Sequence, residues 1–235
     1  MWPTSPAQLI EVQRTLAEAA PTPWRPPRGE PPAIGAVVVV FARGQTGAGA
    51  RGDPAWSAAA VIRRRQLLAE ATVAGAAADL YVPGLLALRE GACLESAVRA
   101  LSAAPDVLLV DATARDHPRR AGLALHLGAV TDVPTVGVTH RPLLARGEWP
   151  DDDRGACSPL VLEGEGVAAW LRTRRGVRPL AIHPGWRTTL QVAIDIVMMA
   201  THGHRTSEPL RHARWLARIA RAHAAQTVAR RPSGE

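Results

Sequence analysis

Long hydrophobic runs alternate along this sequence with segments in which apolar residues recur at helical spacing. The clearest run covers residues 33–41, AIGAVVVVF, and its continuous β-branched character is typical of a strand buried on both faces. A glycine-rich turn then leads to two shorter runs at 56–63 and 67–76, an order that predicts an antiparallel meander. The first third of the chain therefore predicts three consecutive strands.

The rest of the chain alternates between predicted helices and strands. Further strands are predicted at 105–111, 135–140, 166–174 and 177–183. Helices are predicted at 7–20, 85–103, 117–130, 188–200 and 208–225, the third with proline in its first turn. Residues 21–32 are rich in proline and predict an irregular connector, and residues 227–235 predict a frayed tail. This order favours one layered α/β domain with a mixed sheet, spanning residues 1–235.

The charge of the chain is more unusual than its composition. Its 47% hydrophobic content is ordinary for a globular protein, but the net charge is +7 and all 28 basic residues are arginine. Guanidinium groups bind phosphate in a bidentate manner, so this balance favours phosphate-bearing partners. Cys93 and Cys157 make neither a disulfide framework nor a zinc-binding spacing, and no apolar run is long enough to span a membrane. We therefore expect a soluble cytoplasmic protein without a membrane partner, and we take it to be a monomer.

Candidate chemistry begins where the strand at 105–111 ends on a carboxylate, Asp111. His117 follows six residues later, and Glu90 lies six residues into the helix after the YVPG turn. Open α/β sheets place ligands at the carboxyl ends of their strands, and two carboxylates with phosphate oxygens and water suit Mg²⁺. Taken alone, Asp111 is better explained as a turn or N-cap aspartate, and Glu90 as a solvated helix residue.

Several long motifs, in the right order, carry a resemblance to a known family. They are LYVPGLLALRE (80–90), VLLVDATARDHPRRAGLALHLG (107–128), DVPTVGV (132–138) and GHRTSEPLR (203–211). Together they resemble endonuclease V, and the similarity covers most of the chain. The resemblance implies a ribonuclease-H-like fold with a central mixed sheet of five strands flanked by helices. It also implies Mg²⁺-dependent, or Mn²⁺-dependent, hydrolysis of a phosphodiester bond near deoxyinosine in DNA, a DNA repair activity; some members prefer inosine in RNA.

The resemblance also assigns expected roles to individual residues. By this resemblance Glu90, Asp111 and His117 are the expected catalytic residues: Asp111 and Glu90 match metal-site positions, and His117 matches the histidine before Pro-Arg-Arg. Tyr81 matches an aromatic wedge that enters the duplex where the altered base is flipped out, a role whose alternative is a tyrosine packed on its own loop. The other expected nucleic-acid-binding residues are Pro83, Gly84, Arg119 and Arg120, although the two arginines are nearly as well explained as a solvated helix face.

Three positions depart from the family pattern. Val38 stands where the family has an aspartate that shares the metal, His140 where it has a lysine, and Trp186 where it has a histidine. His183 is a weak substitute for that histidine and is better explained as an ordinary strand-end residue. Two hypotheses therefore remain: an attenuated endonuclease V-like nuclease that holds its metal weakly, or a catalytically silent relative that binds nucleic acid or another partner. Cleavage of inosine-containing strands would discriminate between them.

Overall fold

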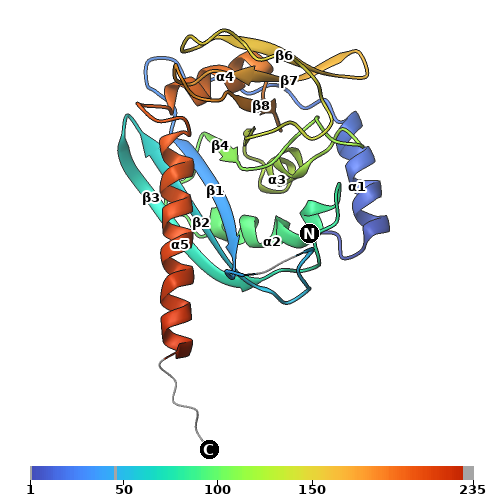
Figure 1. Cartoon of the computed structure of the whole chain (residues 1–235), viewed down its shortest axis with the longest axis vertical. Coiled ribbons are helices and arrows are strands. Elements are labelled where there is room, and N and C mark those ends of the chain that lie inside the picture. The colour runs from blue at the N-terminus through green and yellow to red at the C-terminus, as the bar shows by residue number, and fades with distance from the viewer. Residues whose placement is uncertain (1, 45–46, 230–235) are drawn as a thin grey trace, which may run out of the picture.

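The computed structural model describes residues 2–44 and 47–229, and in this part of the chain eight strands form one mixed sheet (Figure 1). Their order across the sheet is β3-β2-β1-β4-β5-β8-β7-β6. The strands are β1 (Ile34–Phe41), β2 (Pro54–Arg63), β3 (Gln66–Ala76), β4 (Val107–Val110), β5 (Thr135–Thr139), β6 (Cys157–Leu162), β7 (Glu165–Leu171) and β8 (Leu180–Pro184). The helices are α1 (Pro6–Glu18), α2 (Leu86–Arg99), α3 (Leu123–Thr131), α4 (Leu190–Met199) and α5 (Glu208–Ala229).

The parallel strands lie at the centre of the sheet. β4 runs parallel to both β1 and β5, whereas the flanking strands pair antiparallel. Val37 of β1 pairs with Val110, the last residue of β4, so Val38 and Asp111 are the next positions on two adjacent parallel strands. The carboxyl ends of β1 and β4 therefore meet at one edge of the sheet, which is where open α/β sheets bind ligands.

The helices cover both faces of the sheet. One core cluster contains side chains of α1, α2 and α3, and another contains side chains of α4 and α5. In Figure 1 α5 (red) crosses in front of β1, β2 and β3. The helix contacts all three strands, so it packs against the meander. Among the described residues, no helix is both long enough and apolar enough to cross a membrane.

Small residues let α5 approach the sheet closely. Its buried positions Leu210, Ala213 and Ala217 recur at helical spacing and belong to the same core cluster as Val38. Val38 is only 3% exposed, so its isopropyl group is part of this packing. Arg214 follows Ala213 directly, and the close approach of α5 brings it to the edge of the sheet where β1 and β4 end.

The predicted α/β fold is confirmed, and the sheet is larger than expected. The meander and the later strands at 166–174 and 177–183 are present as β2, β3, β7 and β8. The five expected central strands form β3-β2-β1-β4-β5, and β8, β7 and β6 extend them to eight in the described chain. β6 was not predicted because its burial alternates irregularly and it begins at the exposed Cys157.

Several predicted boundaries are wrong; the helix predicted at 85–103, for example, ends at Arg99. The helix predicted from His117 begins only at Leu123, because residues 115–120 fold into turns whose backbone N–H groups bond locally, including Arg120 N–H to His117 O at 2.9 Å. The predicted frayed tail at 227–235 begins too early, since α5 continues through Ala229. The rest of that tail lies outside the described residues. The connector at 21–32 contains no helix or strand, as expected.

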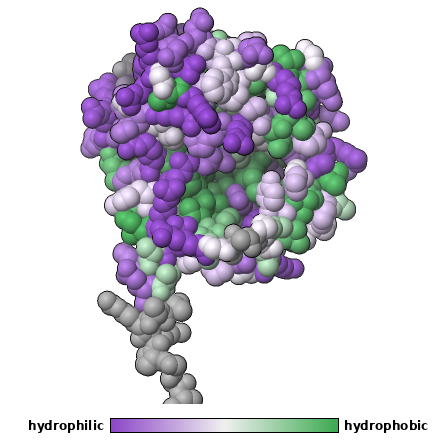
Figure 2. Space-filling view, viewed as in Figure 1, coloured by the Kyte–Doolittle hydropathy of each residue, from purple (hydrophilic) through white to green (hydrophobic). Residues whose placement is uncertain are grey.

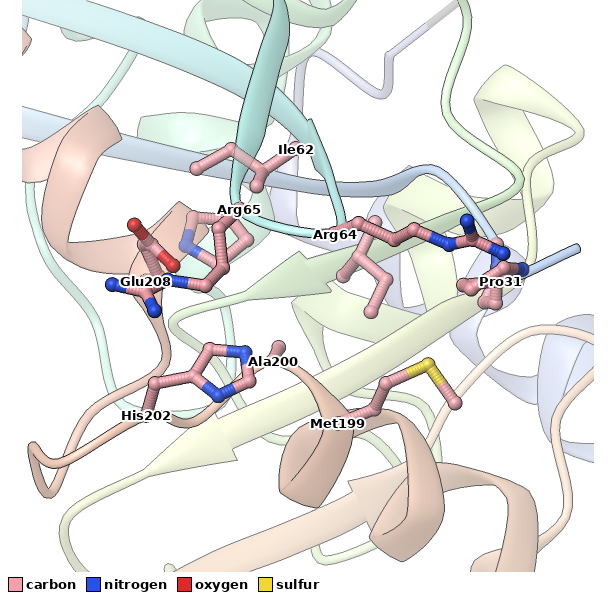
Figure 3. A pocket seen from close by; sticks show the side chains of 11 residues that line it. Pro31, Ile62, Arg64, Arg65, Met199, Ala200, His202 and Glu208 are labelled. Atoms are coloured by element: carbon pink, nitrogen blue, oxygen red, sulfur yellow. The ribbon is translucent and has the colours of Figure 1, made fainter.

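An apolar cavity of about 410 Å³ lies at the amino end of β1, beside Ile34. Figure 3 shows Arg64 and Arg65 on the turn between β2 and β3, with Glu208 beside Arg65 and with Met199 across the cavity from the turn. Both arginines have left-handed backbone conformations, with φ of 48° and 69°, as a two-residue hairpin turn requires. Because Asp111 lies at the other end of the parallel strands, this cavity is separate from the predicted site.

Candidate functional site

The predicted metal residues line a hollow at the carboxyl end of β1. Its volume is about 320 Å³, and its lining combines an apolar floor with a few polar groups. The lining residues are Val37, Val38, Val39, Val40, Tyr81, Leu86, Glu90, Leu94, Asp111 and Arg214. We call this hollow the Asp111 cavity. Figure 2 shows a hollow with a hydrophobic floor beside the hydrophilic column formed by α5.

Asp111 forms an ion pair inside the protein. Its Oδ2 lies 2.6 Å from Nη2 of Arg214, which reaches over from α5. The Arg214 side chain is 22% exposed and that of Asp111 is 42% exposed, so the pair lies at the mouth of the cavity. A charged donor at this distance makes a strong, charge-assisted hydrogen bond. The carboxylate that the sequence assigns to a metal thus already has a cationic partner.

Glu90 also lines the cavity, but its environment disfavours the charged form. Burial raises the pKa of Glu90 to about 7; the positive charge of Arg89 opposes this shift and the negative charge of Asp111 adds to it. The neutral form of Glu90 is therefore populated near pH 7. Glu90 and Asp111 line the same cavity, and a neutral carboxyl is a poor ligand for Mg²⁺.

The cavity does not offer a good donor set for a divalent cation. Val38 supplies only methyl groups at the position beside Asp111. Across residues 2–44 and 47–229, no group of three or more His, Cys, Asp or Glu side chains could hold a metal ion. Burial, and then the positive charge of Arg205, lowers the pKa of His140. The charges of Asp111 and Arg214 also act on this imidazole, in opposite directions. The residues present therefore fit a guanidinium–carboxylate pair better than a bound metal.

Tyr81 lies between the Asp111 cavity and a smaller one. The smaller cavity, of about 190 Å³, lies between the Tyr81 turn and the segment after β4, and Asp111 lines both. The Tyr81 side chain is 44% exposed, and its backbone N–H donates to Ala48 O at 2.8 Å. Gly84 ends the turn with φ of +77°, a left-handed conformation that favours glycine. The exposed ring thus stands on a turn with a defined backbone.

His117 and Arg119 hold this turn from below. Nε2 of His117 lies 3.1 Å from Gly84 O, and Nη2 of Arg119 donates to the same oxygen at 2.6 Å. Nε of Arg119 donates to Gln13 Oε1 at 2.5 Å. Burial, and then the charge of Arg119, lowers the pKa of His117 to about 4, so the imidazole is neutral at pH 7. In this structure both side chains position the Tyr81 turn, and their contact with nucleic acid stays a prediction.

Arg120 lies farther out and is also engaged within the protein. Its Nη2 is 2.9 Å from Glu163 Oε2 and 3.7 Å from Glu165 Oε2, and it donates to Leu162 O at 3.2 Å. The two glutamates are largely exposed, so the pairs are weak and can exchange with phosphate. A role of Arg120 in binding a nucleic-acid backbone also stays a prediction.

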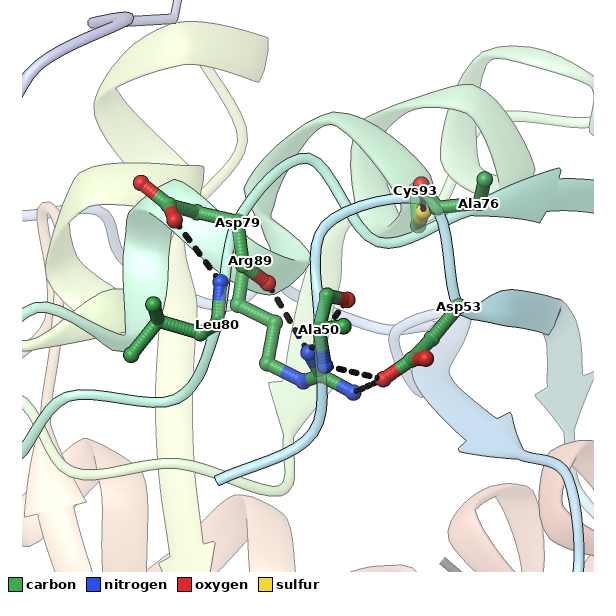
Figure 4. Close-up of polar contacts among 7 residues, drawn as sticks. All are labelled: Ala50, Asp53, Ala76, Asp79, Leu80, Arg89 and Cys93. Carbon is green, nitrogen blue, oxygen red and sulfur yellow. Dashed lines mark hydrogen bonds and ion pairs between the residues drawn. The ribbon is translucent and has the colours of Figure 1, made fainter.

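A buried arginine ties the Tyr81 turn to the glycine-rich loop after β1 (Figure 4). Arg89 is 5% exposed, and its Nη2 lies 2.9 Å from Asp53 Oδ2. Its Nη1 donates to Asp79 O at 2.8 Å and to Ala50 O at 3.2 Å, and its guanidinium carbon lies 4.2 Å from the centre of the Phe41 ring. This one side chain therefore connects α2 to both loops that surround Tyr81.

Trp186, and the possible substitute His183, both have packing roles. His183 is fully buried in β8, its Nε2 lies 3.0 Å from Thr139 Oγ1, and burial lowers its pKa to about 4. Trp186 packs against the α1–α3 core, and its backbone carbonyl accepts from Thr135 N–H at 2.9 Å. A Cβ at Gly128 would lie 2.4 Å from Trp186 Cβ, so the indole fits against a glycine of α3. His183 is a residue of the core, as expected, and does not line the Asp111 cavity.

Sequence reasoning missed three residues that shape the site. They are Arg214, Arg89 and Asp116, the last being fully buried and accepting three backbone N–H groups from Leu143, Leu144 and Ala145. Arg214 and Arg89 were hidden because arginine is so frequent in this chain. The position of Arg89 offered a signal, because it falls among the buried positions of α2, where a charged residue needs a partner.

Comparison with solved structures identifies the class of fold. The endonuclease V structure from Streptomyces avermitilis superposes with a TM-score of 0.83 and 32% identity, covering 95% of this chain and 96% of that one. The catalytic domain of human endonuclease V gives a TM-score of 0.80 at 26% identity, covering 94% of this chain and 97% of that one. The fold is thus the ribonuclease-H-like α/β fold.

The family model for endonuclease V matches residues 34–215, so this chain belongs to the endonuclease V family. An endonuclease V of Roseiflexus sp. (strain RS-1) is 44% identical over 137 residues, which is 58% of this chain and 62% of that protein. The chain thus matches less than two thirds of that relative's length. Ciona intestinalis endonuclease V has been crystallised with a 24mer DNA containing an inosine followed by a ribo-adenosine; at 19% identity and a TM-score of 0.75 it shares the fold, covering 93% of this chain and 98% of that one.

Proposed function

We propose that this protein binds nucleic acid containing deoxyinosine or another altered base, with inosine-containing RNA as an alternative ligand, and that metal-dependent hydrolysis is strongly attenuated or lost. The observation that carries the proposal is the 2.6 Å pair between Asp111 and Arg214, next to Val38. The Asp111 carboxylate is thus already paired with a guanidinium group, which competes with a metal ion for it. The family membership supports the nucleic-acid part, and the Asp111 cavity supports the loss of hydrolysis.

The expected loss of rate follows from charge. Hydrolysis of a phosphodiester needs a cation that activates water and neutralises the charge developing on the phosphoryl oxygens. The cavity contains one carboxylate paired with Arg214 and one carboxyl, Glu90, whose pKa burial raises to about 7. If the missing interactions forfeit only about 4–6 kcal/mol of transition-state stabilisation, the rate falls by roughly 10³–10⁴-fold.

Three features support the binding of a flipped base near Tyr81. Tyr81 is exposed on a turn held by Arg89, His117 and Arg119, and two hollows open beside it. An inserted ring partly replaces the stacking that a duplex loses when a base leaves it. The +7 charge adds sequence-independent attraction to phosphate. We therefore propose that Tyr81, with Pro83 and Gly84 in its turn, contacts the distorted duplex.

Binding and cleavage are tested separately. Fluorescence anisotropy in EDTA compares a duplex containing one deoxyinosine with the matched undamaged duplex, and the proposal expects a preference for deoxyinosine without added metal. Cleavage of the same duplex and of an inosine-containing RNA is then measured with Mg²⁺ and with Mn²⁺. We expect turnover at least about 10³-fold below the roughly 1 s⁻¹ of a modest enzyme. Ordinary turnover would restore the nuclease hypothesis, and equal affinity for both duplexes would remove the altered-base ligand.

A double variant, Val38→Asp with Arg214→Ser, sharpens the result. It adds a carboxylate beside Asp111 and removes the guanidinium that competes with a cation. Cleavage that rises in this variant with Mn²⁺, while Val38→Asn with Arg214→Ser stays inactive, would locate the loss of activity at these two residues. The asparagine control has nearly the same shape but lacks the charge.

A further inference from the structure

One face of α5 combines three arginines with an exposed indole. Arg211, Arg214, Trp215 and Arg218 recur at helical spacing, on the face beside the buried stripe that packs on the sheet. The Trp215 side chain is 55% exposed, and a hollow of about 490 Å³ lies beside it. Its lining residues are Glu208, Arg211, His212, Arg214, Trp215 and Arg218. We call this surface the α5 face.

The α5 face carries positive charge that is not used inside the protein. Arg211 and Arg218 are exposed, and within the described chain neither forms an ion pair. Arg214 is neutralised by Asp111, and the nearest acidic group on the same helix is Glu208. Two guanidinium groups therefore remain for an outside anion, and planar guanidinium groups match phosphate geometry.

Trp215 lies between these two arginines and is partly positioned. Its ring centre is 5.5 Å from that of His212, whose Nε2 is held 2.6 Å from Glu70 Oε2 on β3. Arg211 lies one turn before Trp215 and Arg218 one turn after it. Seven residues of helix span about 10.5 Å, which separates the two guanidinium groups far enough to contact different phosphates of one strand. Aromatic rings flanked by cationic groups are what single-stranded nucleic acid binds, because each base has a free face to stack.

We propose that the α5 face binds the single-stranded nucleic acid that flanks the Asp111 cavity, with one base stacked on Trp215 and phosphates on Arg211 and Arg218. This inference rests on the proposed function, since it extends the same ligand beyond the cleft. Continuity supports it: Arg214 lines both the Asp111 cavity and the hollow of the α5 face. A nucleic-acid strand that leaves the Asp111 cavity past Arg214 would meet Trp215 next.

The test uses the whole protein in EDTA with three probes: a blunt deoxyinosine duplex, the same duplex with a single-stranded extension on either side of the lesion, and a 12-nucleotide single strand. The extension should increase affinity by about tenfold, and Trp215→Ala should remove most of that gain. Trp215→Phe should keep it. A 2-aminopurine in the extension should be quenched by the parent protein and by Trp215→Phe, but not by Trp215→Ala.

The arginines are tested by salt dependence. Removing Arg211 and Arg218 together should lower the slope of log affinity against log salt by about 1.4 for the single strand, since each phosphate contact there contributes roughly 0.7. The control Arg25→Ala with Arg28→Ala removes the same charge from the exposed connector and should leave that slope unchanged. If all variants bind the extended duplex like the parent, the α5 face is not a nucleic-acid surface. If the parent protein shows no preference for deoxyinosine on the blunt duplex, the proposed function is contradicted instead.

Discussion

The Tyr81 turn and the Asp111 cavity lie side by side, yet they have different kinds of internal support. Around the turn, Arg89, His117 and Arg119 all make buried or half-buried hydrogen bonds that fix the backbone. In the cavity, by contrast, Asp111 is paired with Arg214 and Val38 provides no donor. The turn thus has a network of internal hydrogen bonds, whereas the exposed carboxylate of the cavity is already paired with a guanidinium group.

The strongest test of the turn is to remove its buried cation. Arg89→Met should destabilise the protein by about 3–5 kcal/mol, because Asp53 and two carbonyls would lose a buried partner. The free energy of unfolding in urea measures this cost. Arg99→Met is the matched control, since Arg99 is 60% exposed and its pair with Glu95 is an ordinary helix-surface pair. A cost below about 1 kcal/mol for Arg89→Met would mean that the turn is supported by other contacts.

The cavity is tested by returning a carboxylate to β1. Val38→Asp should lower the stability of the metal-free protein by about 3 kcal/mol, because it buries a charge near Glu90 and in a packed position. Millimolar Mn²⁺ should offset part of this cost, since a cation that binds only the folded state stabilises it. Thermal unfolding with and without Mn²⁺ measures the effect. Val38→Asn should pay a similar packing cost without the metal response, and an equal response of both variants would contradict the expectation.

Glu90 gives the cavity a pH dependence of known sign. Its folded pKa, about 7, is above the ordinary value of 4.5, so its contribution to stability is complete below pH 4.5 and is lost as pH rises through 7. In EDTA at pH 4.5, the free energy of unfolding of Glu90→Gln should therefore be nearly equal to that of the parent. At pH 8.5 it should be more stable than the parent by about 2–3 kcal/mol, after allowance for the partly accessible side chain. A stability difference that does not change with pH would show that the carboxyl is already well solvated.

The smallest effect is expected at the tip of the turn. Tyr81→Ala should weaken binding of a deoxyinosine duplex by about 1–3 kcal/mol, the cost of one lost stacking contact. Global stability should change little, because the ring is 44% exposed. Tyr81→Phe should bind like the parent, since the hydroxyl has no role in stacking. Unchanged affinity and lesion preference in Tyr81→Ala would leave Tyr81 an ordinary loop residue.

The sequence allowed the fold to be predicted farther than the site. Strands such as 33–41 and the meander carry their structure in local hydrophobic pattern, so they could be assigned without knowledge of their neighbours. The turn at 115–120 could not, because buried Asp116 stabilises it by accepting N–H groups from residues 143–145. The partner of Asp111 was equally out of reach: Arg214 lies 103 residues away, and its role depends on how closely α5 approaches the sheet.

The pairing of Asp111 with Arg214 also changes how the cavity depends on its surroundings. A cation supplied by a side chain is present in every folded molecule, at a ratio of one to one. Chelators cannot remove it, competing ions cannot replace it, and its supply does not vary with the mineral state of the solution. The positive charge at the mouth of this cavity is thus encoded in the polypeptide and does not depend on the availability of a metal.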